Sequence, residues 1–165
     1  MKKKSSTKDL SLSSNERLYI KNKSNFQPMG YEKLKLKGLK IYTFHAGFKK
    51  KLDDLLIIIF DNIIHCSIVY SKSSMPSAPI IWDKLNNKGL VKALVVNSGN
   101  ANAHTGKRGI KIINQYTDHL SKFIRCNKKE ILVSSTGVIG EYFEPKLIIN
   151  KINEINKKSK NNLLD

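Results

Sequence analysis

Short apolar runs bounded by polar residues predict a series of strands. Residues 53–61 form a run of Leu, Ile and Phe between aspartates, which is typical of a strand covered on both faces. The segment at 65–71 predicts a partner strand, and residues 90–97 and 130–135 predict two more. Residues 80–85 follow two prolines, and the pattern there allows either a short helix or an extended segment.

Apolar positions at helical spacing follow the last two predicted strands. The first set predicts a helix whose apolar face is formed by Ile110, Ile113, Tyr116, Leu120, Phe123 and Ile124. Pro145 suits the first turn of a second helix, which places Ile148, Ile152 and Ile155 on one face. A strand, a polar loop and a helix thus occur twice in succession. This order predicts an α/β fold with polar loops at the strand ends.

Length and composition indicate one domain preceded by a tail. At 165 residues the chain is long enough to bury one core. Residues 1–35 are mainly Lys, Ser and Asn with few apolar positions, and such a segment cannot offset the entropy of becoming ordered. We therefore expect a mobile basic arm at 1–35 and a single domain at 36–165.

The net charge of +17 is concentrated near the N-terminus. Residues 1–51 hold 14 Lys and Arg against 3 Asp and Glu, whereas residues 52–165 hold 16 against 10. Only Arg17, Arg108 and Arg125 are arginines, although arginine is usually frequent on surfaces that bind nucleic acid. The joint abundance of Lys, Ile and Asn favours a compositional bias over a phosphate-binding surface. Nucleic acid is therefore not the expected partner.

Several classes of site have no signal in the sequence. Cys66 and Cys126 lack CxxC spacing and the four His residues show no metal-ligand pattern, so we expect reduced thiols and no metal. The glycines match neither a phosphate loop nor a dinucleotide-binding motif, and no cofactor is expected. The basic start lacks the apolar segment of a secretion signal, and the longest apolar stretch is interrupted by polar residues. We expect a cytoplasmic protein without a membrane partner.

The segment NSGNANAHTG, residues 97–106, consists almost entirely of small and polar residues. Gly99 and Gly106 permit a positive φ, and the three Asn side chains can form hydrogen bonds with peptide groups. Two interpretations remain open. The loop is either a rigid turn fixed by bonds from Asn to the backbone, or a frame that holds a polar ligand.

The segment SSTGVIG, residues 134–140, places a hydroxyl beside an unhindered peptide group. The O–H of Thr136 and the N–H of Gly137 can converge on one point, as the stabilisation of a developing alkoxide in acyl transfer requires. The alternative is a tight turn in which Thr136 caps a neighbouring element. No nucleophile accompanies these donors, because neither a G-x-S-x-G motif nor a Cys–His pair at a known spacing is present.

The two segments together resemble the ornithine acetyltransferase family, also called ArgJ or glutamate N-acetyltransferase. VVNSGNANAHTGKRG is similar to the family's VVNSGNANACTGxxG, and ILVSSTGVIGEYFEPKLI is similar to its VLVASTGVIGxxLPxxKL. A weaker similarity includes a Gly-x-Lys segment before the first apolar run and the segment SAPII. The resemblance covers residues 40–155 and does not extend to the basic arm.

The resemblance implies the N-terminal half of an ArgJ-like layered sheet-and-helix sandwich. Its activity would be the transfer of an acetyl group from N-acetylornithine to glutamate in arginine biosynthesis, with acetyl-CoA as a further substrate in some members. Family members cleave themselves into α and β chains, and the N-terminal Thr of the β chain is the nucleophile. Thr136 and Gly137 would form the oxyanion hole. The expected partner is a β chain, in an α2β2 heterotetramer.

The sequence also departs from the family pattern. It ends at Asp165, before the family's cleavage Thr, so it resembles most of an α chain that would be inactive alone. His104 replaces the usual Cys, and we interpret it as a tolerated loop substitution. Two other hypotheses remain: a basic protein whose arm binds nucleic acid, which predicts binding that weakens steeply with salt, and a truncated relic that has lost its partner.

Overall fold

The computed structural model describes residues 36–158, and a four-stranded sheet forms its centre. In sheet order the strands are β1 (Leu39–Phe44), β2 (Leu55–His65), β3 (Leu90–Asn100) and β4 (Ile131–Val138). The pairs β1–β2 and β2–β3 are antiparallel, and β4 pairs parallel to β3. The helices are α2 (Ala78–Asn86), α3 (Gly106–Ile124), α4 (Lys146–Lys158) and the short 3-10 helix η1 (Lys128–Glu130).

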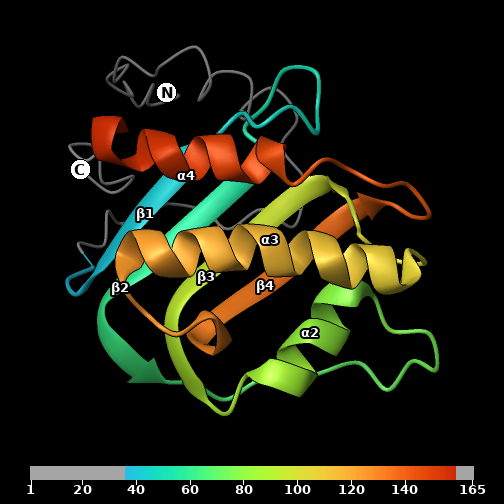
Figure 1. The fold of residues 1–165 in the computed structure, drawn as a ribbon, viewed down its shortest axis with the longest axis horizontal. Coiled ribbons are helices and arrows are strands. Elements are labelled where there is room, and N and C mark those ends of the chain that lie inside the picture. The colour runs from blue at the N-terminus through green and yellow to red at the C-terminus, as the bar shows by residue number, and fades with distance from the viewer. Residues whose placement is uncertain (1–35, 159–165) are drawn as a thin grey trace, which may run out of the picture. The chain divides into compact units, whose positions relative to one another are not determined.

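Helices α3 and α4 lie side by side across one face of the sheet (Figure 1). Both have the predicted apolar face: Ile113, Tyr116 and Leu120 of α3 are at most 2% exposed, and Ile148 and Ile152 of α4 are fully buried. These side chains pack against β-strand residues in one hydrophobic core. The predicted α/β class and the two predicted strand, loop and helix units are therefore confirmed, and residues 80–85 belong to helix α2.

The connection from β3 through α3 to β4 determines where the polar motifs meet. Because β3 and β4 are parallel neighbours, their C-terminal ends lie at the same edge of the sheet. Asn100 ends β3 and Val138 ends β4. The two motifs identified in the sequence are therefore brought together by the topology.

The prediction of a partner strand at 65–71 is wrong. Strand β2 passes through a register shift after Ile59 and continues to His65, and the chain then leaves the sheet. Residues 66–77 form no helix or strand, and Val69 is 98% exposed. Strand β2 pairs instead with β1. The alternating sequence of β1, LKIYTF, directly follows the Lys-rich segment and was not predicted as a strand. The expected arm itself, residues 1–35, lies outside the described residues.

The two faces of the sheet differ in burial. Residues on the helix face are almost fully buried, namely Leu55, Ile57, Val91, Ala93 and Val95. The alternate residues on the other face are half-buried, namely Leu56, Ile58, Leu94 and Val96. The prediction that β2 is covered on both faces is therefore only partly right. No helix within residues 36–158 combines the length and the apolar character needed to span a bilayer.

Helix α2 contributes a buried carboxylate to β4. The Asp83 side chain, 6% exposed as a residue, accepts a hydrogen bond from the Val133 backbone N–H at 3.2 Å. Burial raises the pKa of Asp83 from 3.8 to about 7, and the bond from Val133 only partly opposes this rise. No ion pair to Asp83 is formed within the described part of the chain.

This raised pKa predicts a pH-dependent stability. The folded state binds the Asp83 proton more tightly than the unfolded state, so its contribution is greatest below about pH 4 and is lost as pH rises towards about 7. Asp83→Asn keeps a neutral acceptor for Val133 and should reduce the loss of unfolding free energy between pH 5 and pH 8, measured by urea titration. The control is Asp118→Asn, which removes an exposed carboxylate whose pKa is lowered by its bond to Lys122. An unchanged slope in Asp83→Asn would contradict the assignment.

Candidate functional site

The two sequence motifs form one unit at the C-terminal ends of β3 and β4. Their residues are paired, Ser98 with Thr136 and Gly99 with Gly137. Beyond the strands the pairing continues, since the Ala101 N–H donates to the Val138 carbonyl and the Gly140 N–H to the Ala103 carbonyl, both at 2.9 Å. The expectation that 98–100 and 136–138 are loops is wrong, because both segments extend their strands.

Gly99 and Gly137 bring two backbones into close contact. Gly137 has a φ of +131°, and a Cβ there would collide with the Gly99 carbonyl carbon and lie 2.6 Å from the Asn100 nitrogen. Gly99 has a φ of +112°, and a Cβ there would lie 2.9 Å from the Phe48 Cβ. Only glycine satisfies both the backbone conformation and this spacing at either position. Gly99 and Gly137 thus have a steric explanation.

Asn97 connects the two strands immediately before the Thr136–Gly137 pair. Its side chain, in a residue 2% exposed, donates to the Asn100 carbonyl at 2.8 Å. Its Oδ1 accepts from the Ser135 hydroxyl at 2.6 Å. Because both polar ends of the buried amide are satisfied, the bond fixes β4 relative to β3 one residue before Thr136.

The other two Asn side chains of the first motif bind the backbone around it. The Asn100 amide donates to the Glu141 carbonyl at 3.0 Å, and its Oδ1 accepts from the Asn102 N–H at 2.8 Å. The Asn102 amide donates to the Gly109 carbonyl at 3.2 Å. The amides therefore act as the rigid brace that one of the two sequence interpretations describes, and they hold the β4–α4 connection in place.

A turn between β1 and β2 packs onto the glycine pair, and sequence reasoning missed its key residue. The buried Asp54 carboxylate accepts hydrogen bonds from the N–H groups of Ala46, Gly47 and Lys49 at 2.6, 3.2 and 2.8 Å. This arrangement places Phe48 against Gly99 and edge-on to Phe143, with ring centroids 5.0 Å apart. The pair of acids Asp53 and Asp54, between a Gly-x-Lys segment and an apolar strand, was the available signal.

Thr136 and Gly137 are both exposed at this end of the sheet. Within residues 36–158 the Thr136 hydroxyl forms no hydrogen bond, so it is available to a ligand. The rigid frame and the exposed hydroxyl together are suited to binding a polar atom at a fixed position.

The remaining candidate residues lie outside this arrangement. His104 is exposed with a φ of +58°, and it lines a cavity at the start of α3. Cys66 and Cys126 are free, partly buried thiols, and burial raises the pKa of Cys126 to about 11. Residues 36–158 contain no group of three or more His, Cys, Asp or Glu able to bind a metal ion.

The backbone contact predicts a large difference between two glycine substitutions. Gly137→Ala and Gly140→Ala both place Ala at a positive φ, but the added Cβ at Gly140 would meet no atom within 4 Å. Gly140→Ala should lower the free energy of unfolding by about 1–2 kcal/mol because of the backbone conformation. Gly137→Ala should lower it by about 1–3 kcal/mol more because the added Cβ collides with the Gly99 backbone. Urea unfolding of both variants measures the difference. Equal costs would show that the backbones separate easily.

Comparison with known proteins gives this geometry a context. The sequence model of the ArgJ family matches residues 40–164. The arginine biosynthesis bifunctional protein ArgJ of Bartonella henselae is 38% identical over 127 residues, which are 76% of this chain and 31% of that relative. The protein of the same name from Bradyrhizobium diazoefficiens is 42% identical over 106 residues, 64% of this chain and 26% of the relative. The chain spans between about a quarter and a third of the length of these curated relatives.

Two solved structures have a similar fold. The crystal structure of ArgJ from Bacillus halodurans has a TM-score of 0.67 at 32% identity, over 72% of this chain and 63% of that chain. Ornithine acetyltransferase of Mycobacterium tuberculosis, complexed with ornithine, has a TM-score of 0.65 over 70% of this chain and 64% of that one. At 22% identity the latter shows the fold alone. With the match over residues 40–164, these findings confirm the predicted ArgJ-like α/β fold and establish that the chain belongs to the ArgJ family.

Proposed function

We propose that this chain is the α-chain part of an N-acetyltransferase that moves acetyl from N-acetylornithine to glutamate. The observation that carries the proposal is the rigid pairing of the two motifs, which leaves Thr136 and Gly137 exposed at the end of the sheet. In this role the Thr136 hydroxyl and the Gly137 N–H form the oxyanion hole. The nucleophile is the N-terminal Thr of a separate β chain.

In the proposed reaction this chain stabilises the negative charge that develops on the acetyl oxygen. The β-chain Thr hydroxyl attacks the acetyl carbonyl carbon, and its proton passes to the Thr α-amine, whose ordinary pKa of about 7.7–8.0 suits a base at neutral pH. The carbonyl oxygen becomes an alkoxide, which the two donors of the oxyanion hole stabilise. Ornithine then leaves with a proton. The amine of glutamate attacks the acetyl-enzyme by the same route, which releases N-acetylglutamate and restores the Thr.

The lengths of the relatives support a division into two chains. The match to the Bartonella henselae relative covers 76% of this chain but only 31% of that relative. The match to the solved Bacillus halodurans chain covers a similar 72% of this chain and 63% of that chain. The solved chain is therefore about half as long as the curated relative, as expected for one of two cleavage products. The half-buried apolar residues on the second face of the sheet are suited to contact with such a partner. We propose an α2β2 assembly on the same basis.

The substrates are inferred from the relatives. The names of the curated relatives refer to arginine biosynthesis, and the Mycobacterium tuberculosis neighbour was solved with ornithine. We propose that the complete assembly binds small amino-acid substrates in the cytoplasm, accepts acetyl-CoA as a further acetyl donor and needs no cofactor.

A reconstituted complex tests the role of Thr136. The full chain is co-expressed with the C-terminal remainder of a curated relative, beginning at its Thr, and acetyl transfer from N-acetylornithine to glutamate is followed. Thr136→Ala should lower kcat about a hundredfold or more because one oxyanion donor is lost, whereas Thr136→Ser should retain most activity.

The matched control is Ser134→Ala, which removes an exposed hydroxyl from the same strand. It should leave kcat nearly unchanged. Equal activity of Thr136→Ala and the unaltered complex would disprove the oxyanion role. A folded complex without any transfer would instead favour the inactive relic.

A further inference from the structure

Two adjoining cavities open around the first turn of α3, outside the Thr136–Gly137 pair. Their volumes are about 570 Å³ and about 540 Å³. Both are lined by residues 104–107, so the cavities share a wall. The first cavity is half open to solvent and the second is a shallow, open depression, so a bound ligand would stay partly exposed.

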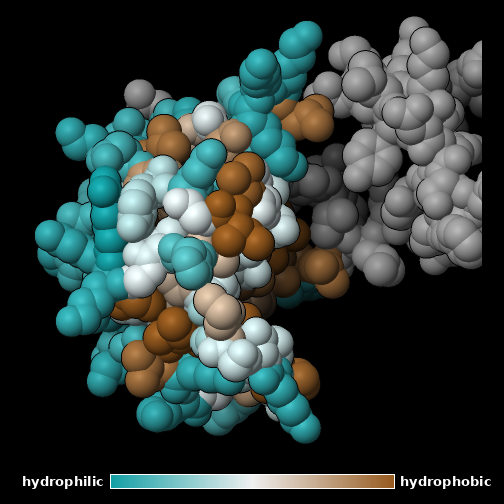
Figure 2. Space-filling model, turned by 90° about the vertical axis from the view of Figure 1, so that its right-hand side faces the viewer, coloured by the Kyte–Doolittle hydropathy of each residue, from teal (hydrophilic) through white to brown (hydrophobic). Residues whose placement is uncertain are grey.

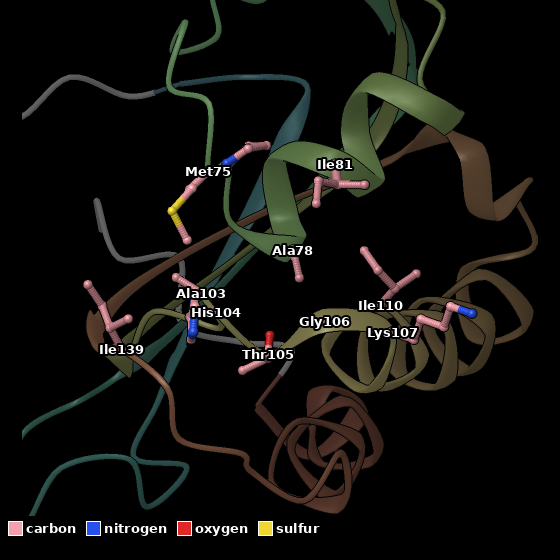
Figure 3. Close-up of a pocket in the computed structure, with 11 residues that line it drawn as sticks. Met75, Ala78, Ile81, Ala103, His104, Thr105, Gly106, Lys107, Ile110 and Ile139 are labelled. Carbon is pink, nitrogen blue, oxygen red and sulfur yellow. The ribbon is translucent and has the colours of Figure 1, made fainter.

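The first cavity is mainly apolar. It lies between the coil before α2, the start of α3 and the β4–α4 connection (Figure 3). The apolar residues of its wall include Met75, Pro76, Ala78, Ile81, Ile110 and Ile139. Met75 and Ile139 lie on different sides of the cavity and are 69% and 67% exposed. Apolar side chains so accessible to water favour an apolar ligand between them.

The second cavity is cationic. Lys107 and Arg108 line it and are exposed, and the first turn of α3 contains no acidic residue. Neither side chain forms an ion pair within residues 36–158. The Arg108 guanidinium lies over the Tyr142 ring, 4.2 Å from its centroid, which orients the group at the edge of the cavity. Two adjacent cations without an ion-pair partner among the described residues favour an anion.

The shared wall is rigid. Asn102 and His104 adopt positive φ values of 45° and 58°, which non-glycine residues rarely do. The Thr105 hydroxyl donates to the Asn102 Oδ1 at 2.8 Å, and this oxygen belongs to a residue that is 1% exposed. The wall is therefore formed before any ligand arrives, which lowers the entropy cost of binding.

We propose that the two cavities bind a small amphipathic anion. Its alkyl or acyl part occupies the apolar cavity, and its carboxylate or phosphate is bound by Lys107 and Arg108. Lys107 and Arg108 follow the Asn-rich segment directly in the sequence, so the site and the motif share one loop. This binding does not depend on acetyl transfer and requires no second chain.

The test is calorimetric titration of the full chain with octanoate, octyl phosphate and 1-octanol. We expect at least one of the two anions to bind at least about tenfold more tightly than 1-octanol, as a charge-assisted bond predicts. The relative affinity of the two anions identifies the preferred head group. Equal affinity for all three, or no binding of either anion, would overturn the proposal.

Variants locate the binding. The double variant Lys107→Ala and Arg108→Ala should weaken anion binding at least about tenfold, and Ile139→Asp should weaken it similarly because the apolar cavity becomes charged. Lys111→Ala is the matched control, since this exposed lysine of α3 lines neither cavity. All these positions are exposed, and circular dichroism verifies that each variant is folded. Loss of binding in Lys111→Ala equal to that in the double variant would overturn the assignment to these cavities.

Discussion

The close contact between the backbones of Gly99 and Gly137 is the constraint on which the site depends. Neither position has room for a Cβ, and both have φ values that favour glycine. The contact lets β3 and β4 stay paired to their very ends, where parallel strands usually separate into loops. Phe48 covers this contact from the neighbouring turn, and the buried Asp54 carboxylate holds that turn in shape. Thr136 is thus presented from a backbone that has little freedom to move.

The polar side chains around this contact serve rigidity more than chemistry. Asn97, Asn100 and Asn102 each use the side-chain amide to bind a backbone carbonyl. A motif that contains so many amides could be mistaken for a ligand-binding surface, yet the amides are already satisfied within the fold. The Thr136 hydroxyl in the same region, by contrast, forms no hydrogen bond within residues 36–158. The structure thus distinguishes, within the two motifs, the amides that stabilise the backbone from the hydroxyl that can bind a ligand.

The sequence allowed the elements with a strong period to be predicted. Helices α3 and α4 were predicted because their apolar residues recur at helical spacing, and the cores of β2, β3 and β4 because their apolar runs have clear polar bounds. The segment at 65–71 was mistaken for a strand because alternation of apolar and polar residues does not show whether a neighbouring strand is available for pairing. The role of Asp54 could not be predicted, because it depends on backbone N–H groups that only the folded turn brings together. Likewise, the pairing of Gly99 with Gly137 depends on strand register.

The Asp83 carboxylate binds a backbone N–H of β4, a strand at the edge of the described sheet. β4 is the outermost strand on its side of the described sheet, and such strands can recruit a further strand through their unpaired backbone groups. The Val133 N–H is already bonded to Asp83 of α2. An incoming chain would have to displace a helix to reach it. A side chain that takes no part in the proposed chemistry therefore closes one backbone position of this edge to an added strand.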